Sequence, residues 1–223
     1  MEDDNETDMN IEQDLEARLA KAPVVPLIGA SDTGVAVETA EALSAGGLNV
    51  IEVVLRTDEA VDCMEAIVKH TSGLIVGAGT VLTVAQAEEV IARGAQFVVC
   101  PGLVDEVADY CLKQNVPLYA GTMTAGEVQR AYALGLRSVK FFPAKLAGGV
   151  PMLKALSSVF REMRFMPTGG VSAENLDEFL ALPSVIACGG SWLTPAAAID
   201  AGDYAVITNL AREAVSIASA ARP

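Results

Sequence analysis

Histidine and paired cysteines are scarce in this chain, and each shortage argues against a class of site. The sequence has one His, four Cys and 5% aromatic residues among 223 residues. A lone histidine, His70, argues against a histidine-rich metal site and against a histidine base. The four Cys form no CxxC pair, and a chain of this length can bury a core without disulfides. A reducing compartment is therefore expected.

Basic residues and long apolar runs are also few. Fifteen Lys and Arg stand against 29 Asp and Glu, which gives a formal charge of −14. That charge argues against a nucleic-acid partner and against an anionic membrane surface. No apolar run reaches the roughly 18–20 residues that a spanning helix needs, and the acidic start does not resemble a signal peptide. We therefore expect a cytoplasmic protein without a nucleic-acid or membrane partner.

Short apolar runs bounded by Gly or Pro recur along the chain, and each precedes a segment with helical periodicity. Their starts lie 20 to 26 residues apart. Eight units at this near-constant period predict an α/β fold, a (βα)8 TIM barrel, rather than an open sheet. The eight runs are Val24–Ala30, Val50–Leu55, Ile75–Val81, Phe97–Pro101, Pro117–Gly121, Val139–Pro143, Arg164–Gly169 and Val185–Gly190.

The ends of the chain and of its helices can also be predicted. Residues 1–10 are expected to form a disordered acidic tail, and residues 11–223 a single barrel domain, in which Ile11–Ala22 forms an extra N-terminal helix at the barrel bottom. Helix starts are expected at three hydroxyl residues, each of which begins a segment that resembles a capping box. Helix ends are expected at glycines just before the next strand. These positions are Thr83, Thr124 and Ser172 for the starts, and Gly47, Gly94 and Gly135 for the ends.

Three ionisable residues stand in or beside predicted strands, where Val, Ile or Leu normally fill a barrel. Glu52 lies in the second run, Arg56 directly follows it, and Lys140 lies in the sixth. Strand alternation puts Glu52 and Arg56 on one face, and turns all three toward the barrel axis if their apolar neighbours face the helices. The structural alternative is a buried ion pair that only holds the barrel together, although such pairs often stabilise no more than apolar residues do.

Together the three side chains suit catalysis by an amine. Burial favours the neutral form of an amine, and a neutral amine attacks ketones. The resulting iminium lets a neighbouring carbon–carbon bond break, and the reaction needs an acid/base to carry protons. Glu52 is the one carboxylate at a strand position comparable to that of Lys140. The Arg56 guanidinium could form paired hydrogen bonds with a substrate carboxylate.

Glycine pairs beside small hydroxyl residues end the last two runs, in Pro167–Ser172 and Cys188–Trp192. The loops after strands 7 and 8 of (βα)8 barrels frequently bind phosphate through backbone N–H groups and a helix N-terminus. Two such pairs on these strands favour a phosphate site over simple tight turns. A third glycine-rich segment, Gly77–Thr80, is less specific, and its Thr80 could contact a ligand or only pack.

Six motifs, each on its own predicted strand and in the same order, resemble those of the 2-keto-3-deoxy-6-phosphogluconate (KDPG) aldolase family, also called 4-hydroxy-2-oxoglutarate (KHG) aldolase. The resemblance spans about Val24 to Asp203. It implies a class I aldolase, without a metal or other cofactor, that cleaves KDPG to pyruvate and glyceraldehyde 3-phosphate in the Entner–Doudoroff pathway. It also implies a homotrimer. The motifs are Ile51–Thr57, Val76–Leu82, Cys100–Gly102, Val139–Ala144, Pro167–Gly170 and Gly189–Trp192.

The resemblance further implies a role for each site residue. Lys140 would be the Schiff-base nucleophile, and Glu52 the general acid/base, acting partly through water. Arg56 and Thr80 would bind the pyruvate carboxylate. The other implied binding residues shape the pyruvate pocket (Pro101 and Phe142) or hold the phosphate (Gly169, Gly170 and Ser191, with Thr168 and Gly190 nearby).

Several alternatives stay open at this point. An aldolase for the galactonate epimer of the same phosphate shares the Lys, the Glu and the phosphate loops. A phosphate-binding barrel isomerase usually needs a metal or two opposed acids, for which no His/Asp cluster is present. A non-catalytic barrel would leave the three ionisable residues without a shared purpose. The choice between a phosphorylated substrate and unphosphorylated 4-hydroxy-2-oxoglutarate is also open.

Two positions near the predicted mouth depart from the family pattern, and one lysine there could be mistaken for the nucleophile. The segment Ala120–Thr124 stands where the family often has Pro-Gly-x-x-Thr, and Cys100 where Ser or Thr is commoner. Both departures bear on specificity for the aldehyde half of the substrate more than on the chemistry. Lys145 lies five residues after Lys140, but beyond Pro143, and is expected in the loop rather than on the strand.

Overall fold

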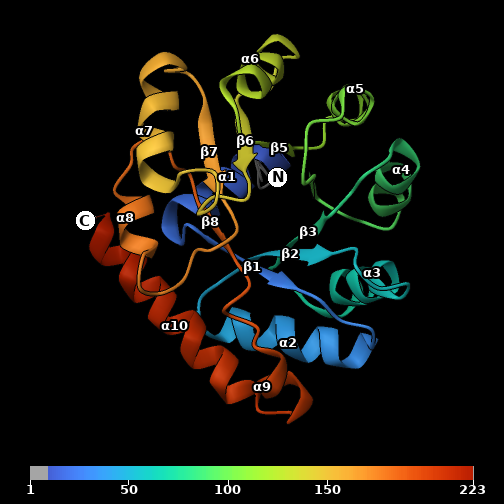
Figure 1. The fold of residues 1–223 in the computed structure, drawn as a ribbon. Coiled ribbons are helices and arrows are strands. Elements are labelled where there is room, and N and C mark those ends of the chain that lie inside the picture. Colours follow the sequence, from blue (N-terminus) through green and yellow to red (C-terminus); the bar gives the residue numbers. More distant parts are fainter. Residues whose placement is uncertain (1–9, 223) are drawn as a thin grey trace, which may run out of the picture.

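Eight parallel strands surround a common axis, with helices packed outside them (Figure 1). The computed structural model describes residues 10–222. The strands are β1 (Val24–Ile28), β2 (Val50–Val54), β3 (Ile75–Gly79), β4 (Phe97–Val99), β5 (Leu118–Thr122), β6 (Ser138–Phe141), β7 (Arg164–Pro167) and β8 (Cys188–Gly190). The helices are α1 (Ile11–Lys21), α2 (Thr33–Ala45), α3 (Ala60–His70), α4 (Val84–Ala92), α5 (Asp105–Gln114), α6 (Ala125–Ala133), α7 (Gly149–Val159), α8 (Leu176–Leu180), α9 (Ala196–Asp200) and α10 (Tyr204–Ala221).

The strand order closes the sheet into a barrel. Seven parallel pairings join the strands in the order β7-β6-β5-β4-β3-β2-β1-β8. Two isolated bridges, Phe165 to Val185 and Thr168 to Gly189, link the ends of this order. The predicted (βα)8 barrel is therefore confirmed, and the C-terminal ends of the strands meet at one mouth.

The predicted start of the eighth strand is wrong, because residues 185 and 186 pair only with β7, and pairing with β1 begins at Cys188. The Ile186 N–H donates to the Phe165 carbonyl on β7 at 2.9 Å, whereas the Cys188 N–H donates to the Pro23 carbonyl just before β1, also at 2.9 Å. Regular strand pairing therefore begins at Cys188 rather than at Val185.

Two of the three predicted helix starts are confirmed. Thr83 accepts a hydrogen bond from the backbone N–H of Gln86, and Thr124 forms a complete capping box with Glu127. The prediction for Ser172 is wrong. Its N–H donates to Asn175 Oδ1 at 2.9 Å, which closes a turn, and α8 begins only at Leu176.

The predicted N-terminal helix is confirmed as α1, which Asn10 caps by accepting a hydrogen bond from the Glu12 N–H. Leu15 and Leu19 are its buried residues, and they pack against apolar side chains near the amino ends of the strands, including Phe97. Burying two leucines contributes about 3–6 kcal/mol. The helix therefore covers the end of the barrel opposite the mouth. Residues 1–9 of the predicted acidic tail lie outside the described residues.

Three of the helices are followed by a glycine in the left-handed conformation. Gly47, Gly94 and Gly135 follow helices with φ of 96°, 98° and 94°, as predicted, and glycine adopts this conformation without steric cost. Between residues 10 and 222, no helix is both long and apolar enough to cross a membrane.

Candidate active site

A buried lysine and a buried glutamate meet inside the barrel. Glu52 on β2 is 0% exposed and Lys140 on β6 is 4% exposed. Their side chains form an ion pair, with 3.4 Å between Lys140 Nζ and Glu52 Oε1. Val53 and Val139, which neighbour them in sequence, belong to the outer apolar core that also includes the helices. The alternation predicted from the sequence is therefore present at both strands.

The second carboxylate oxygen of this pair is unpartnered. Glu52 Oε2 is buried and has no hydrogen-bond partner among the described residues. A buried acceptor without a partner is costly, so it marks a place where water or a ligand can bind. The arrangement provides one buried amine, one carboxylate in contact with it and one free oxygen for proton exchange.

Glycine on β3 provides the room for the Glu52 side chain. A Cβ placed on Gly79 would overlap Glu52 Oε1 and would lie 2.6 Å from both Cδ and Cγ of Glu52. Glu52 is paired with Gly77 across the β2–β3 ladder, and Gly79 is the last residue of β3. The contact between this glycine and Glu52 could not be predicted from the sequence, because it depends on the register between two strands.

Neighbouring residues contact both the side chain and the backbone of Lys140. Its Nζ lies 5.2 Å from the centre of the half-buried Phe142 ring, within cation–π range. Thr122 on β5 donates a hydrogen bond to the Lys140 carbonyl at 3.1 Å, a contact that sequence analysis missed. Cys100 is buried after β4, and this burial, followed by the influence of Cys111, raises the pKa of the Cys100 thiol to about 12. The thiol is therefore protonated at neutral pH.

Three other predicted site residues follow the carboxyl ends of strands β2, β3 and β4. Arg56 lies two residues beyond β2 and is exposed. Thr80 directly follows β3 with a φ of 62°, a left-handed conformation that is unfavourable for a β-branched residue. Pro101 lies two residues beyond β4 and is half-buried, and its carbonyl would be overlapped by a Cβ on Gly121. All three residues are therefore at the mouth. Arg56 forms no ion pair with another described residue.

The two glycine-rich loops that follow β7 and β8 lie side by side. The bridge between Thr168 and Gly189 connects them directly, and a Cβ on Gly189 would overlap the Thr168 hydroxyl. Gly169 and Gly170 have φ of 94° and 81°, which only glycine adopts readily.

Their amides are available for a ligand. Within residues 10–222, the N–H groups of Gly169, Gly170 and Ser191 donate to no carbonyl or side chain. Ser191 is exposed, whereas Gly190 beside it is buried under the ring of Trp192. Free amides on adjacent loops form the kind of site that binds an anion.

Lys145 is in the loop after β6, as predicted, and is exposed. Its N–H donates to the Gly169 carbonyl at 3.0 Å, so it lies beside the first of the two glycine-rich loops. This proximity could not be read from the sequence, where the two residues are 24 positions apart.

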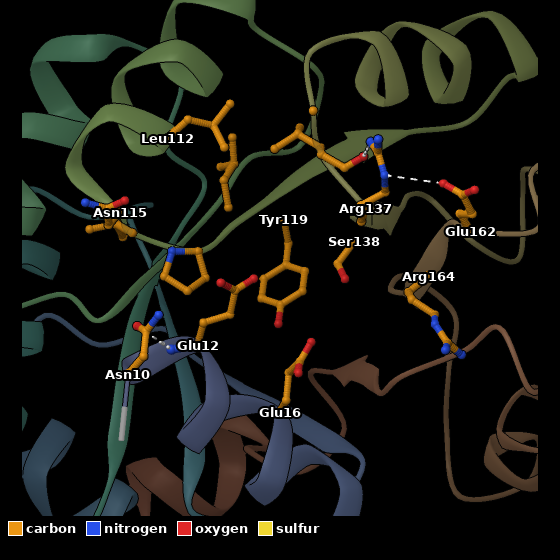
Figure 2. Close-up of a pocket in the computed structure, with 15 residues that line it drawn as sticks. Asn10, Glu12, Glu16, Leu112, Asn115, Tyr119, Arg137, Ser138, Glu162 and Arg164 are labelled. Carbon is orange, nitrogen blue, oxygen red and sulfur yellow. Dashed lines mark hydrogen bonds and ion pairs between the residues drawn. The ribbon is translucent and has the colours of Figure 1, made fainter. Parts of the chain in front are cut away.

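A separate hollow of about 390 Å³ opens at the other end of the barrel, between α1 and the amino ends of β5, β6 and β7. Figure 2 shows the Tyr119 hydroxyl pointing into it toward Glu16. Burial, with the nearby Glu16 and Glu12, raises the pKa of Tyr119, so the phenol stays protonated. This hollow contains neither Glu52 nor Lys140.

Potential metal ligands are dispersed in the part of the chain that the structure describes. Across residues 10–222, no three His, Cys, Asp or Glu side chains gather in an arrangement that could hold a metal ion.

Comparisons with known proteins agree on one family. A family model described as KDPG and KHG aldolase matches residues 15–210. The KHG/KDPG aldolase of Escherichia coli (strain K12) is 48% identical over 200 residues, which cover 90% of this chain and 94% of that protein.

Two solved structures are similarly close. The KDPG aldolase of Zymomonas mobilis ZM4, solved with 3-phosphoglycerate, is 41% identical with a TM-score of 0.85, covering 92% of this chain and 96% of that one. The KDPG aldolase of Legionella pneumophila, in which pyruvate was captured as a covalent carbinolamine intermediate, is also 41% identical with a TM-score of 0.85, covering 88% and 96%. By sequence and by structure, the chain belongs to the KDPG and KHG aldolase family.

Proposed function

We propose that this protein is a class I aldolase that cleaves KDPG to pyruvate and glyceraldehyde 3-phosphate through a Schiff base on Lys140. The observation that carries the proposal is the buried contact between Lys140 and Glu52 at 3.4 Å. It provides the nucleophile and the proton carrier of amine catalysis at the same point inside the barrel. The carbinolamine captured in the Legionella pneumophila relative supports the same chemistry.

The proposed reaction begins with attack of the neutral Lys140 amine on the C2 carbonyl of the substrate. Glu52 carries protons as the carbinolamine forms and loses water to give the iminium. Removal of the C4 hydroxyl proton then breaks the C3–C4 bond, which releases the aldehyde and leaves its electron pair in the enamine. Protonation of the enamine at C3 and hydrolysis of the iminium release pyruvate and restore the amine. The free oxygen Oε2 of Glu52 fits an exchange of protons through water.

The two charged ends of the substrate are assigned to different sides of the mouth. Arg56 and Thr80 are proposed to hold the carboxylate of the keto acid, as a guanidinium and a hydroxyl can. Pro101 and Phe142 are proposed to shape the pyruvate pocket. The phosphate is assigned to the loops after β7 and β8, through Gly169, Gly170 and Ser191, with Thr168 and Gly190 beside them. Their free amides, and the 3-phosphoglycerate in the Zymomonas mobilis relative, support this assignment.

A second activity, cleavage of 4-hydroxy-2-oxoglutarate to pyruvate and glyoxylate, is also proposed. The Escherichia coli relative is described as acting on both compounds, since it is a KHG/KDPG aldolase. Both substrates present the same 2-keto acid to Lys140, and they differ in the aldehyde half. The galactonate epimer and a barrel isomerase are the alternatives, and product analysis with each stereoisomer separates them.

Further proposals concern the protein as a whole. We propose that residues 11–223 act as one barrel domain, that the protein forms homotrimers and works in the cytoplasm, and that its cleavage reaction belongs to the Entner–Doudoroff pathway. Its partners are then a small phosphorylated 2-keto acid and other copies of itself. Sedimentation that shows only monomer would contradict the trimer.

The decisive experiment is to trap the Schiff base. The protein is incubated with pyruvate and borohydride, with and without a chelator, and its intact mass and peptides are measured. One pyruvate adduct on Lys140, unaffected by chelator, is expected. Lys140→Ala should lose the adduct and all turnover, whereas Glu52→Gln should keep some adduct and lower kcat by about 10²–10⁴-fold. Full activity of Lys140→Ala would refute the assignment.

A further inference from the structure

We propose that Lys145 binds the phosphate of the substrate and gives the enzyme its preference for phosphorylated over unphosphorylated 2-keto acids. The inference rests on the proposed function and adds a residue to it. Lys145 was predicted in a loop, and no role was predicted for it. Its position against the first glycine-rich loop suggests one.

The contact between Lys145 and Gly170 is the first observation. A Cβ on Gly170 would lie 2.5 Å from Lys145 Cβ, 3.0 Å from Cδ and 3.3 Å from Cγ. The aliphatic part of the lysine therefore occupies the space that any other residue at position 170 would need. The bond from the Lys145 N–H to the Gly169 carbonyl fixes the backbone at the same place. The ammonium group is therefore within one lysine side chain's length of the Gly169 and Gly170 amides.

The second observation is that the Lys145 charge is not neutralised. Lys145 forms no ion pair with any carboxylate that the structure describes, whereas Lys69, Arg93, Arg130 and Arg137 all do. Lys145 is also exposed, so its ammonium group can move to meet an anion at these loops. The chain has a formal charge of −14, which repels an anionic substrate. An unpaired cation at the anion site would offset this repulsion locally.

The third observation concerns the other two cations at the mouth. Lys140 contacts Glu52, and Arg56 follows β2 on the side assigned to the keto-acid carboxylate. The free amides of Gly169, Gly170 and Ser191 carry only partial charges. A phosphate dianion bound at these amides would carry two negative charges. The full positive charge next to it would be that of Lys145.

This arrangement predicts selectivity rather than catalysis. A charge-assisted hydrogen bond from an exposed lysine to phosphate should change binding by about tenfold, after allowance for screening by solvent. An unphosphorylated substrate makes no such contact. The ratio of kcat/KM for KDPG to kcat/KM for 4-hydroxy-2-oxoglutarate should therefore depend on the charge at position 145.

The test compares this ratio among charge variants of the full chain. Lys145→Gln should lower the ratio about tenfold, Lys145→Glu should lower it further, and Lys145→Arg should keep it within about twofold of the wild type. Lys154→Gln is the matched control, because Lys154 is an exposed lysine on α7 outside the mouth loops and its loss changes the net charge equally. The ratio should be unchanged in that control.

Ionic strength provides an independent readout. Added salt should raise KM for the phosphorylated substrate more in the wild type than in Lys145→Gln, because salt screens an exposed ion pair. A ratio that stays within twofold of the wild type in both Lys145→Gln and Lys145→Glu would overturn the inference. Failure of the proposed function would be seen separately, as an unmodified Lys140 after pyruvate and borohydride in the wild type.

Discussion

Replacing Gly79 with alanine should disable the site without changing any ionisable residue. The new Cβ would overlap Glu52 Oε1 and lie 2.6 Å from Cδ and Cγ of the same side chain. Glu52 would have to move to relieve this overlap, and because it is 0% exposed and paired with Lys140 at 3.4 Å, the movement would disturb the buried ion pair. Overpacking alone costs about 1–3 kcal/mol, and separating Glu52 from Lys140 raises the cost toward about 3–5 kcal/mol.

Gly79→Ala should also lower the catalytic rate, and this loss can be measured separately from the loss of stability. A shift of about 1 Å in a catalytic group can reduce the rate by about 10²-fold. We therefore expect Gly79→Ala to lower kcat by about two orders of magnitude at a temperature where circular dichroism shows it folded. The control is Gly126→Ala on α6, where the nearest heavy atom to the added Cβ is 4.0 Å away. That change should stabilise the protein by about 0.5–1 kcal/mol and leave kcat unchanged.

A double-mutant cycle isolates the cause. In a Glu52→Ala background the Cγ, Cδ and Oε1 atoms are gone, so Gly79→Ala should cost less than about 1 kcal/mol there. In a Glu52→Gln background the shape is kept but the ion pair with Lys140 is absent, so the cost of Gly79→Ala should fall to about 1–3 kcal/mol, that of overpacking alone. Chemical denaturation measures each free energy of unfolding. Equal costs of Gly79→Ala in the Glu52→Ala and wild-type backgrounds would refute the reasoning.

Three further predictions follow from local geometry. Thr80→Gly relieves a φ of 62° and should raise the free energy of unfolding by about 1 kcal/mol while lowering kcat/KM, as measured by denaturation and steady-state assay; a fall in stability would contradict the strain. A Cβ at position 46 would overlap Ala211 on α10, so Gly46→Ala should lower the melting temperature by several degrees. An unchanged melting temperature would show that α10 can shift to make room for the added methyl group. Thiol reagents should leave the native protein unmodified at pH 8 and label it in denaturant, since all four thiols are buried and their pKa values are raised; rapid native labelling would disprove this. The thiols are those of Cys63, Cys100, Cys111 and Cys188.

The sequence carried enough information for the barrel and for the central pair of the site. The spacing of its apolar runs predicted eight strands, because period and composition are local properties of a chain. The inward direction of Glu52 and Lys140 followed from alternation along two short strands. The same local logic failed at Ser172, whose N–H donates to Asn175 Oδ1 and closes a turn, and at Val185, which pairs only with β7 because pairing with β1 starts at Cys188.

Contacts between distant segments could not be predicted in this way. The fit of Glu52 over Gly79 depends on the β2–β3 register, and the fit of Lys145 over Gly170 depends on how two loops leave neighbouring strands. Neither depends on residue type alone. The unfavourable conformation of Thr80 was equally invisible, because nothing in the identity of a threonine indicates a positive φ.

Trp192 gives the molecule a built-in optical reporter. It is the single tryptophan of the chain, and its ring covers Gly190 next to Ser191 in the loop after β8. Indole emission responds to the polarity and charge around the ring, so a dianion that settles on this loop should change the fluorescence of the unlabelled protein. With no other tryptophan contributing background, titration with inorganic phosphate or 3-phosphoglycerate would report occupancy of this one corner of the mouth, independently of turnover.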